Sequence, residues 1–202
     1  MSVTLTTESI RWGIARIKEK VDVCASELNE LDGALGDGDL GVTMTNGMRK
    51  LFEEAPLLPE DVGAAFLQCA QVFTGVTAST YGAILATGMM AAAKATQGRT
   101  SVSWLEVSPL LDAAIQAMSA RGKAQLGDKT VLDALDAIRK AAEGLDDPVA
   151  IVGRADQAVT VVLAEFRDRP FRQGRARIFG DKGLGLNDPG MVALKRMVEA
   201  LA

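Results

Sequence analysis

The chain has 202 residues, 48% of them hydrophobic, which is enough for one sizeable core or at most two small ones. The net charge of −4 gives no electrostatic basis for binding nucleic acid or an anionic membrane, and no apolar run is long enough to span a membrane. The chain contains no histidine, so histidine cannot serve as a catalytic base, a phosphate carrier or a metal ligand. Any metal must be held by oxygen atoms or by two separated thiols, and a hard cation is the natural choice.

The start of the chain and its two cysteines indicate the compartment. The first eight residues lack the basic and apolar regions of a signal peptide. Cys24 and Cys69 lie within apolar helical patterns, and we expect both to be buried free thiols. These features predict a reducing, cytoplasmic location.

Apolar residues recur at spacings of three or four through nearly the whole chain, which predicts an all-α protein. The expected helices cover about residues 6–30, 43–53, 60–73, 75–94, 103–121, 128 or 130 to 143, 148–167 and 188–202. Pro56 and Pro59 end the second helix, whereas Asp188 and Pro189 suit the start of the last one. Short loops favour a single domain over residues 1–202, folded as an up-and-down bundle or helical barrel.

Two longer loops, at about residues 32–43 and 169–187, interrupt this regular pattern. The first loop carries Asp32, Asp37 and Asp39, separated by glycines. Three short carboxylates on such flexible backbone can point at one place, where they repel each other unless a cation binds. Mg²⁺ takes oxygen ligands of this kind and bridges to phosphates. A simple acidic turn is the alternative, whereas an EF-hand fails because Met48 stands where its glutamate belongs.

Three further glycine-bearing segments could join the acidic loop if they meet at one end of the bundle. Residues 74–82 offer hydroxyl groups at a helix start, where phosphate binds well. Residues 122–133 nearly match a P-loop, but Asp128 interrupts the Gly-Lys-Thr step, and it is either a catalytic carboxylate or a helix cap. Residues 174–176 and 187–190 supply an arginine and another helix cap. Taken singly, each segment is also explained by ordinary capping or solvation.

Taken together and in this order, the segments resemble the L subunit of dihydroxyacetone kinase, which is the nucleotide-binding subunit. The resemblance covers essentially the whole chain. Its most specific parts are L-D-x-x-x-G-D-G-D-x-G at 31–41, Y-G at 81–82, R-G-K-A-x-x-G-D-K-T at 121–130, G-R-A at 174–176 and D-P-G at 188–190. The resemblance implies a barrel of eight antiparallel helices with a nucleotide at one end.

The resemblance also implies roles for individual residues. Asp32, Asp37 and Asp39 match the carboxylates that hold two Mg²⁺ ions against the phosphates of ADP or ATP. The remaining nucleotide-binding positions correspond to Leu40, Gly41, Val42, Thr43, Val76, Thr77, Gly122, Val131, Arg175, Asp188, Pro189 and Gly190. Asp128 is the candidate catalytic carboxylate on the side of the phosphoryl acceptor.

In this family a histidine on a separate K subunit or domain holds the acceptor ketose covalently. Because this chain has no histidine, we expect a kinase subunit that is active only with a K-type partner. In one branch ADP stays bound and a phosphohistidine phosphotransferase protein recharges it, and in the other ATP exchanges. A free-standing L chain favours the first branch, and a homodimer is a further candidate assembly.

Several positions depart from the family pattern. Leu40 stands where histidine is usual, Thr43 where asparagine is expected, and Thr77-Ala78 replaces a Ser-Gly step. Leu186 and Asn187 occupy a region that usually carries a histidine. The metal ligands are intact. Two alternatives therefore stay open: a kinase subunit for another short ketose such as erythrulose, and a nucleotide-binding regulatory protein that has lost catalysis.

Overall fold

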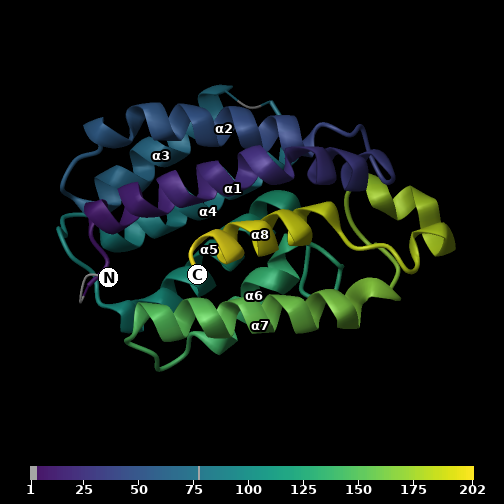
Figure 1. The fold of residues 1–202 in the computed structure, drawn as a ribbon. Helices are drawn as coiled ribbons and strands as arrows, with labels where there is room; N and C mark the ends of the chain where they lie inside the picture. Colours follow the sequence, from purple (N-terminus) through teal and green to yellow (C-terminus); the bar gives the residue numbers. More distant parts are fainter. Residues whose placement is uncertain (1–3, 77) are drawn as a thin grey trace.

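Eight α-helices run up and down the computed structural model, which describes residues 4–76 and 78–202 (Figure 1). The helices are α1 (Thr7–Gly33), α2 (Leu40–Glu54), α3 (Val62–Val76), α4 (Thr80–Thr96), α5 (Val107–Gly122), α6 (Val131–Ala141), α7 (Pro148–Arg167) and α8 (Pro189–Ala200). Three 3₁₀ segments accompany them: η1 (Ala55–Leu57), η2 (Trp104–Glu106) and η3 (Arg175–Gly183). Within the described residues, β pairing is limited to one isolated bridge between Leu5 and Val102.

The helices form a closed ring, because each helix packs against the next one and α8 packs against α1 (Figure 1). Two apolar clusters fill the interior. One joins α1, α2 and α3, the other joins α5, α6 and α7, and α8 contributes Val192 to the first and Met191 to the second. The predicted all-α, antiparallel eight-helix barrel is confirmed.

Several helix boundaries differ from the expected ones. Helix α2 begins at Leu40 rather than at about residue 43, and α3 continues to Val76. Helix α4 then begins at Thr80, because the Ser79 hydroxyl accepts a hydrogen bond from the Gly82 amide and caps it. Residues 169–187, expected to be a loop, contain the 3₁₀ segment η3.

The two ends of the barrel have different linings. At one end, the cleft end, α2, α4, α6 and α8 begin. At the opposite end, the far end, α1, α3, α5 and α7 begin. An apolar cavity of about 840 Å³ reaches the far end, and its walls include Ile10, Trp12, Phe66, Trp104, Ile151 and Leu201.

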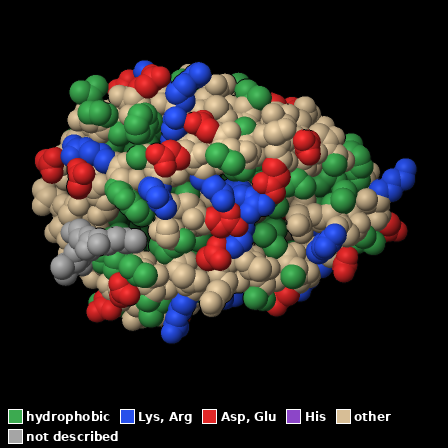
Figure 2. Space-filling model, viewed as in Figure 1, with side chains coloured by type: hydrophobic (Ala, Val, Ile, Leu, Met, Phe, Trp, Pro, Cys, Tyr) green, Lys and Arg blue, Asp and Glu red, His purple; other side chains and the backbone are tan. Residues whose placement is uncertain are grey.

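On the outer surface, acidic and basic side chains are interspersed over the face shown in Figure 2. This mixture accords with the small net charge of the chain. Among the described residues, no helix combines the length and the apolar character needed to cross a membrane.

Candidate functional site

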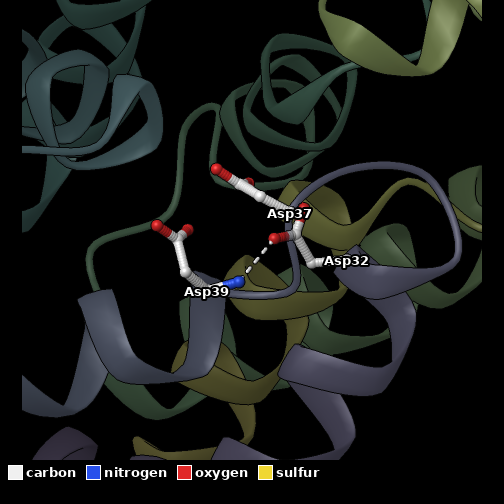
Figure 3. Close-up of side chains that lie close together, drawn as sticks. All are labelled: Asp32, Asp37 and Asp39. Atoms are coloured by element: carbon white, nitrogen blue, oxygen red, sulfur yellow. Dashed lines mark hydrogen bonds between the residues drawn. The ribbon is translucent and has the colours of Figure 1, made fainter.

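Three aspartates surround the connection between α1 and α2 at the cleft end. Asp32 lies in the last turn of α1, Asp37 lies in the connecting loop, and Asp39 stands at the N-cap position of α2 (Figure 3). Gly38 has a φ of +75°, a left-handed conformation that glycine adopts without strain and that turns the loop back. The Asp39 amide donates a hydrogen bond to Asp32 Oδ2 at 3.0 Å. One carboxylate oxygen from each residue lies within 4.8 Å of the other two, as their sequence spacing predicted.

The Asp39 carboxylate is free of the capping role that its position would normally give it, since it accepts no capping hydrogen bond. Instead, Asn29 of α1 reaches across and its Oδ1 accepts from the amides of Gly41 at 2.8 Å and Val42 at 3.3 Å. This arrangement needs glycine at position 41, because a Cβ there would lie 2.0 Å from the Ala25 carbonyl oxygen. The close approach of the two helices therefore leaves the Asp39 carboxylate available to a ligand.

The charges around the aspartates are unequal. Arg175 forms an ion pair with Asp37, and this hydrogen-bonded guanidinium lowers the pKa of the Asp37 carboxyl group. The pKa of Asp39 is raised, first by partial burial and then by the negative charges of Asp37 and Asp32. Three carboxylates that repel one another, of which only Asp37 forms an ion pair, are a donor set that fits a hard divalent cation.

A cleft of about 760 Å³ opens beside the aspartates. Its walls come from the acidic loop, from the starts of α4, α6 and α8, from the end of α5 and from residues 173–178. With the start of α2 at Leu40, four helix N-termini therefore face this region, and their partial positive charge favours an anion such as a phosphate group. Ten of the predicted site residues line the cleft: Asp32, Asp37, Asp39, Leu40, Gly122, Val131, Arg175, Asp188, Pro189 and Gly190.

The other predicted positions lie elsewhere. Gly41 and Thr43 are buried in α2, Val42 is exposed, and Val76 is exposed at the end of α3. None of these four is part of the cleft lining among the described residues. Thr77 lies outside the described residues.

Asp128, the candidate catalytic residue, lies in the turn between α5 and α6 and outside the cleft lining. Its Oδ2 accepts a hydrogen bond from the Gln125 amide at 2.7 Å, and its carbonyl oxygen accepts one from the Arg172 amide at 3.1 Å. In this structure Asp128 organises the turn.

The start of α8 is locked against α4. Asp188 caps α8, since its Oδ1 accepts from the Met191 amide at 2.8 Å, and burial raises the pKa of Asp188 to about 7. The Tyr81 hydroxyl donates to the Gly190 carbonyl at 3.1 Å. A Cβ at Gly190 would lie 2.8 Å from the Tyr81 ring, so the glycine makes room for the aromatic side chain.

Tyr81 lines the cleft but was not among the predicted site residues, although the Tyr-Gly pair at 81–82 is one of the sequence motifs. Ser79, Thr130 and Gln173 also line the cleft. Hydroxyl groups at a helix start indicated Ser79, and Thr130 lies in the glycine-bearing segment at 122–133, whereas no local pattern indicated Gln173.

Comparisons with known proteins show the family and the fold of this chain. The DAK2 domain model matches residues 34–202. The PEP-dependent dihydroxyacetone kinase, ADP-binding subunit DhaL, from Escherichia coli (strain K12) is 27% identical over 97% of this chain and 95% of its own length. The L-erythrulose 1-kinase of Mycolicibacterium smegmatis is 28% identical over 96% of this chain, but over only 35% of its own length.

The fold also matches a solved structure, that of the dihydroxyacetone kinase from C. freundii in complex with AMP-PNP and Mg²⁺. The TM-score is 0.76 and the sequence identity is 23%, over 98% of this chain and 34% of that one. This chain therefore spans about a third of the larger kinase and shares the fold of that part. Since the family model covers most of the sequence, the chain belongs to the DAK2 domain family, as its resemblance to the L subunit of dihydroxyacetone kinase indicated.

Proposed function

We propose that this chain is the nucleotide-binding subunit of a dihydroxyacetone (glycerone) kinase and that residues 1–202 form one nucleotide-binding domain. The observation that carries this proposal is the group of three carboxylates within 4.8 Å of one another, beside a cleft walled by helix N-termini. The name of the Escherichia coli relative, an ADP-binding subunit of nearly the same length, supports it.

Asp32, Asp37 and Asp39 would hold Mg²⁺, two ions in our proposal, and bound Mg²⁺ would neutralise phosphate charge during phosphoryl transfer. Asn29 keeps Asp39 free for this role by taking over the amides of α2. The capped starts of α4, α6 and α8 would orient the phosphates and the nucleoside of ADP or ATP. Arg175, which pairs with Asp37, would neutralise part of the phosphate charge.

The phosphoryl acceptor would be a small ketose held by a separate K-type subunit, because this chain has no histidine to bind one covalently. The relative named as PEP-dependent supports recharging of bound ADP by a phosphohistidine protein rather than exchange of ATP. We propose that Asp128 acts on the acceptor side, so Asp128→Ala should slow transfer and leave nucleotide binding nearly intact. Equal turnover of the variant with its K partner would reduce Asp128 to a turn residue.

A second candidate activity is the phosphorylation of another short ketose. The relative named L-erythrulose 1-kinase favours it. Parallel assays of dihydroxyacetone and erythrulose with the cognate K subunit decide between the two substrates. If Mg²⁺·ADP binds but neither ketose is phosphorylated, the chain is a nucleotide-binding regulator, in line with the departures at Leu40 and Thr43.

The first test is thermal unfolding with ADP and Mg²⁺ and again with EDTA. A ligand at a hundred times its Kd adds about 2.7 kcal/mol to the free energy of unfolding. Asp37→Asn should abolish this Mg²⁺-dependent gain while the helical content stays unchanged. Asp181→Asn, an exposed carboxylate outside the cleft lining, is the matched control. Unchanged affinity in Asp37→Asn would refute the site.

A further inference from the structure

Lys129 is a buried lysine directly behind the cleft. Its side chain is only 1% exposed, and its φ of +63° places it in the left-handed region. The residue precedes Thr130 and Val131, which line the cleft at the start of α6, but Lys129 itself is not part of the lining. The Lys129 side chain can therefore affect the cleft only through other residues.

The Lys129 ammonium group binds the segment that follows α7. Its Nζ donates to the carbonyl oxygens of Arg167 at 2.9 Å and Arg169 at 2.8 Å, and it lies 4.0 Å from the centre of the Phe171 ring. An ammonium group at a helix C-terminus and over an aromatic face is attracted by both. Lys129 thus fixes the point at which the chain leaves α7.

This point is also where residues 169–187 close on themselves. The Arg167 carbonyl oxygen accepts from the Gly185 amide at 3.0 Å, and Arg167 Nε donates to the Gly185 carbonyl at 2.8 Å. The Arg167 carbonyl oxygen therefore joins Lys129 to Gly185, near the other end of the segment. Between these ends, residues 173–178 form one wall of the cleft.

The Phe171 ring carries the contact onward to the acidic loop. Phe171 packs with Leu35 and Ala176 in a small buried cluster that stands apart from the two main ones. Leu35 lies between Asp32 and Asp37 in the sequence, and Ala176 is next to Arg175. The cluster therefore connects the proposed metal ligands with the arginine that pairs with them.

Stability alone does not account for a lysine here. Within the described chain no carboxylate forms an ion pair with Lys129, and burial lowers its pKa although Asp188 and Asp168 act in the opposite direction. A protein with a well-packed apolar side chain in such a place is often as stable as one with a buried charge, or more stable. The two carbonyl bonds instead give the segment one defined position.

We propose that Lys129 is a positioning residue, which holds residues 169–187 and, through Phe171 and Leu35, the three aspartates in the arrangement that binds Mg²⁺·ADP. This inference rests on the proposed function for its ligand. It concerns a residue that touches neither the metal site nor the cleft.

The test compares Lys129→Met with Lys182→Met, an exposed lysine of the same segment. Circular dichroism first confirms that each variant is folded. We expect Lys129→Met to weaken Mg²⁺·ADP binding by about tenfold, as is typical when a supporting group behind a metal ligand is lost. Without nucleotide, trypsin should cleave it faster after Arg175 and Arg177 than the wild type. Lys182→Met should match the wild type in both measurements.

Lys129→Arg separates positioning by the charged group from simple space filling. A guanidinium can donate to both carbonyls and stack on the Phe171 ring, so it should recover part of the affinity that Lys129→Met loses. A wild-type Kd in Lys129→Met, or an equal loss in Lys129→Met and Lys129→Arg, would overturn the proposal.

If Lys129→Met does not fold, Phe171→Leu decides instead. It removes the ring beneath the ammonium group but keeps an apolar side chain beside Leu35. Weaker Mg²⁺·ADP binding in a folded Phe171→Leu variant supports the proposal, and an unchanged Kd overturns it. A wild-type chain that does not bind Mg²⁺·ADP would refute the proposed function, whereas the cleavage rates without nucleotide would still show whether Lys129 holds the segment.

Discussion

The two ends of the barrel start from the same plan but differ in chemistry. Four helices begin at each end, so each end presents four helix N-termini. At the far end they surround an apolar cavity, whereas at the cleft end they meet three carboxylates and Arg175. Helix dipoles alone therefore do not make a site. The segments that connect the helices determine which end binds a ligand, above all the connection between α1 and α2, where Asn29 takes the capping role and frees Asp39.

We expect the largest effect on the cleft end when a substitution forces α1 and α2 apart. In Gly41→Ala the added Cβ meets the rigid Ala25 carbonyl at 2.0 Å, so we expect a loss of about 3 kcal/mol or more in the free energy of unfolding. Mg²⁺·ADP binding should be lost with it, since Asn29 and Asp39 shift. Urea unfolding and calorimetric titration measure the two effects.

Gly153→Ala is the control for this substitution. Gly153 is an exposed residue within α7, and its Cβ would meet nothing within 4 Å. It should gain about 0.5–1 kcal/mol from better helix propensity. If Gly41→Ala were equally stable, the close approach of α1 and α2 would not be needed.

The pH dependence of stability provides a second, smaller test. Burial raises the pKa of Asp188 from 3.8 to about 7, so its charged form is disfavoured in the folded state. The free energy of unfolding should therefore fall as pH rises from about 4 to about 7, and the penalty should stay constant above that. The full shift corresponds to about 4 kcal/mol, and the partial solvent exposure of Asp188 reduces our expectation to about 2 kcal/mol.

Asp188→Asn keeps a good N-cap and removes the charge. It should be more stable than the wild type at pH 8 and equally stable near pH 4, as measured by urea unfolding across this range. A difference that does not change with pH would contradict the assignment of the raised pKa to Asp188.

The smallest test compares one helix cap at each end. Ser79 caps α4 at the cleft end and Thr6 caps α1 at the far end, so each change to alanine should cost about 1 kcal/mol. Only Ser79→Ala should also weaken Mg²⁺·ADP binding, because of these two helices only α4 begins at the cleft. Equal changes of Kd in both variants would show that the two ends are energetically coupled.

The sequence predicted the barrel well because apolar periodicity is a local signal. The predicted bounds of α7 agree with the structure. Its start is marked by two neighbouring residues, the N-cap Asp147 and Pro148, so the signal is local. The start of α2 was placed three residues late, because the Gly-Asp run looked like a loop while tertiary contacts from Asn29 complete the first turn.

The same division applies to the site. The grouping of Asp32, Asp37 and Asp39 could be predicted, because all three lie within eight residues. The burial of Gly41 against Ala25 and the contacts of Lys129 with Arg167 could not, since they join distant parts of the chain. The roles assigned to all the predicted site residues, including those outside the cleft lining such as Thr43, Val76 and Asp128, stay predictions.

The placement of the aromatic residues gives each end its own spectroscopic reporter. The only tyrosine, Tyr81, lines the cleft, whereas the only two tryptophans, Trp12 and Trp104, line the cavity at the far end. Near-ultraviolet difference spectra can therefore follow a ligand at the cleft through the tyrosine bands without any label. A simultaneous change in tryptophan emission would reveal that the signal travels the length of the barrel.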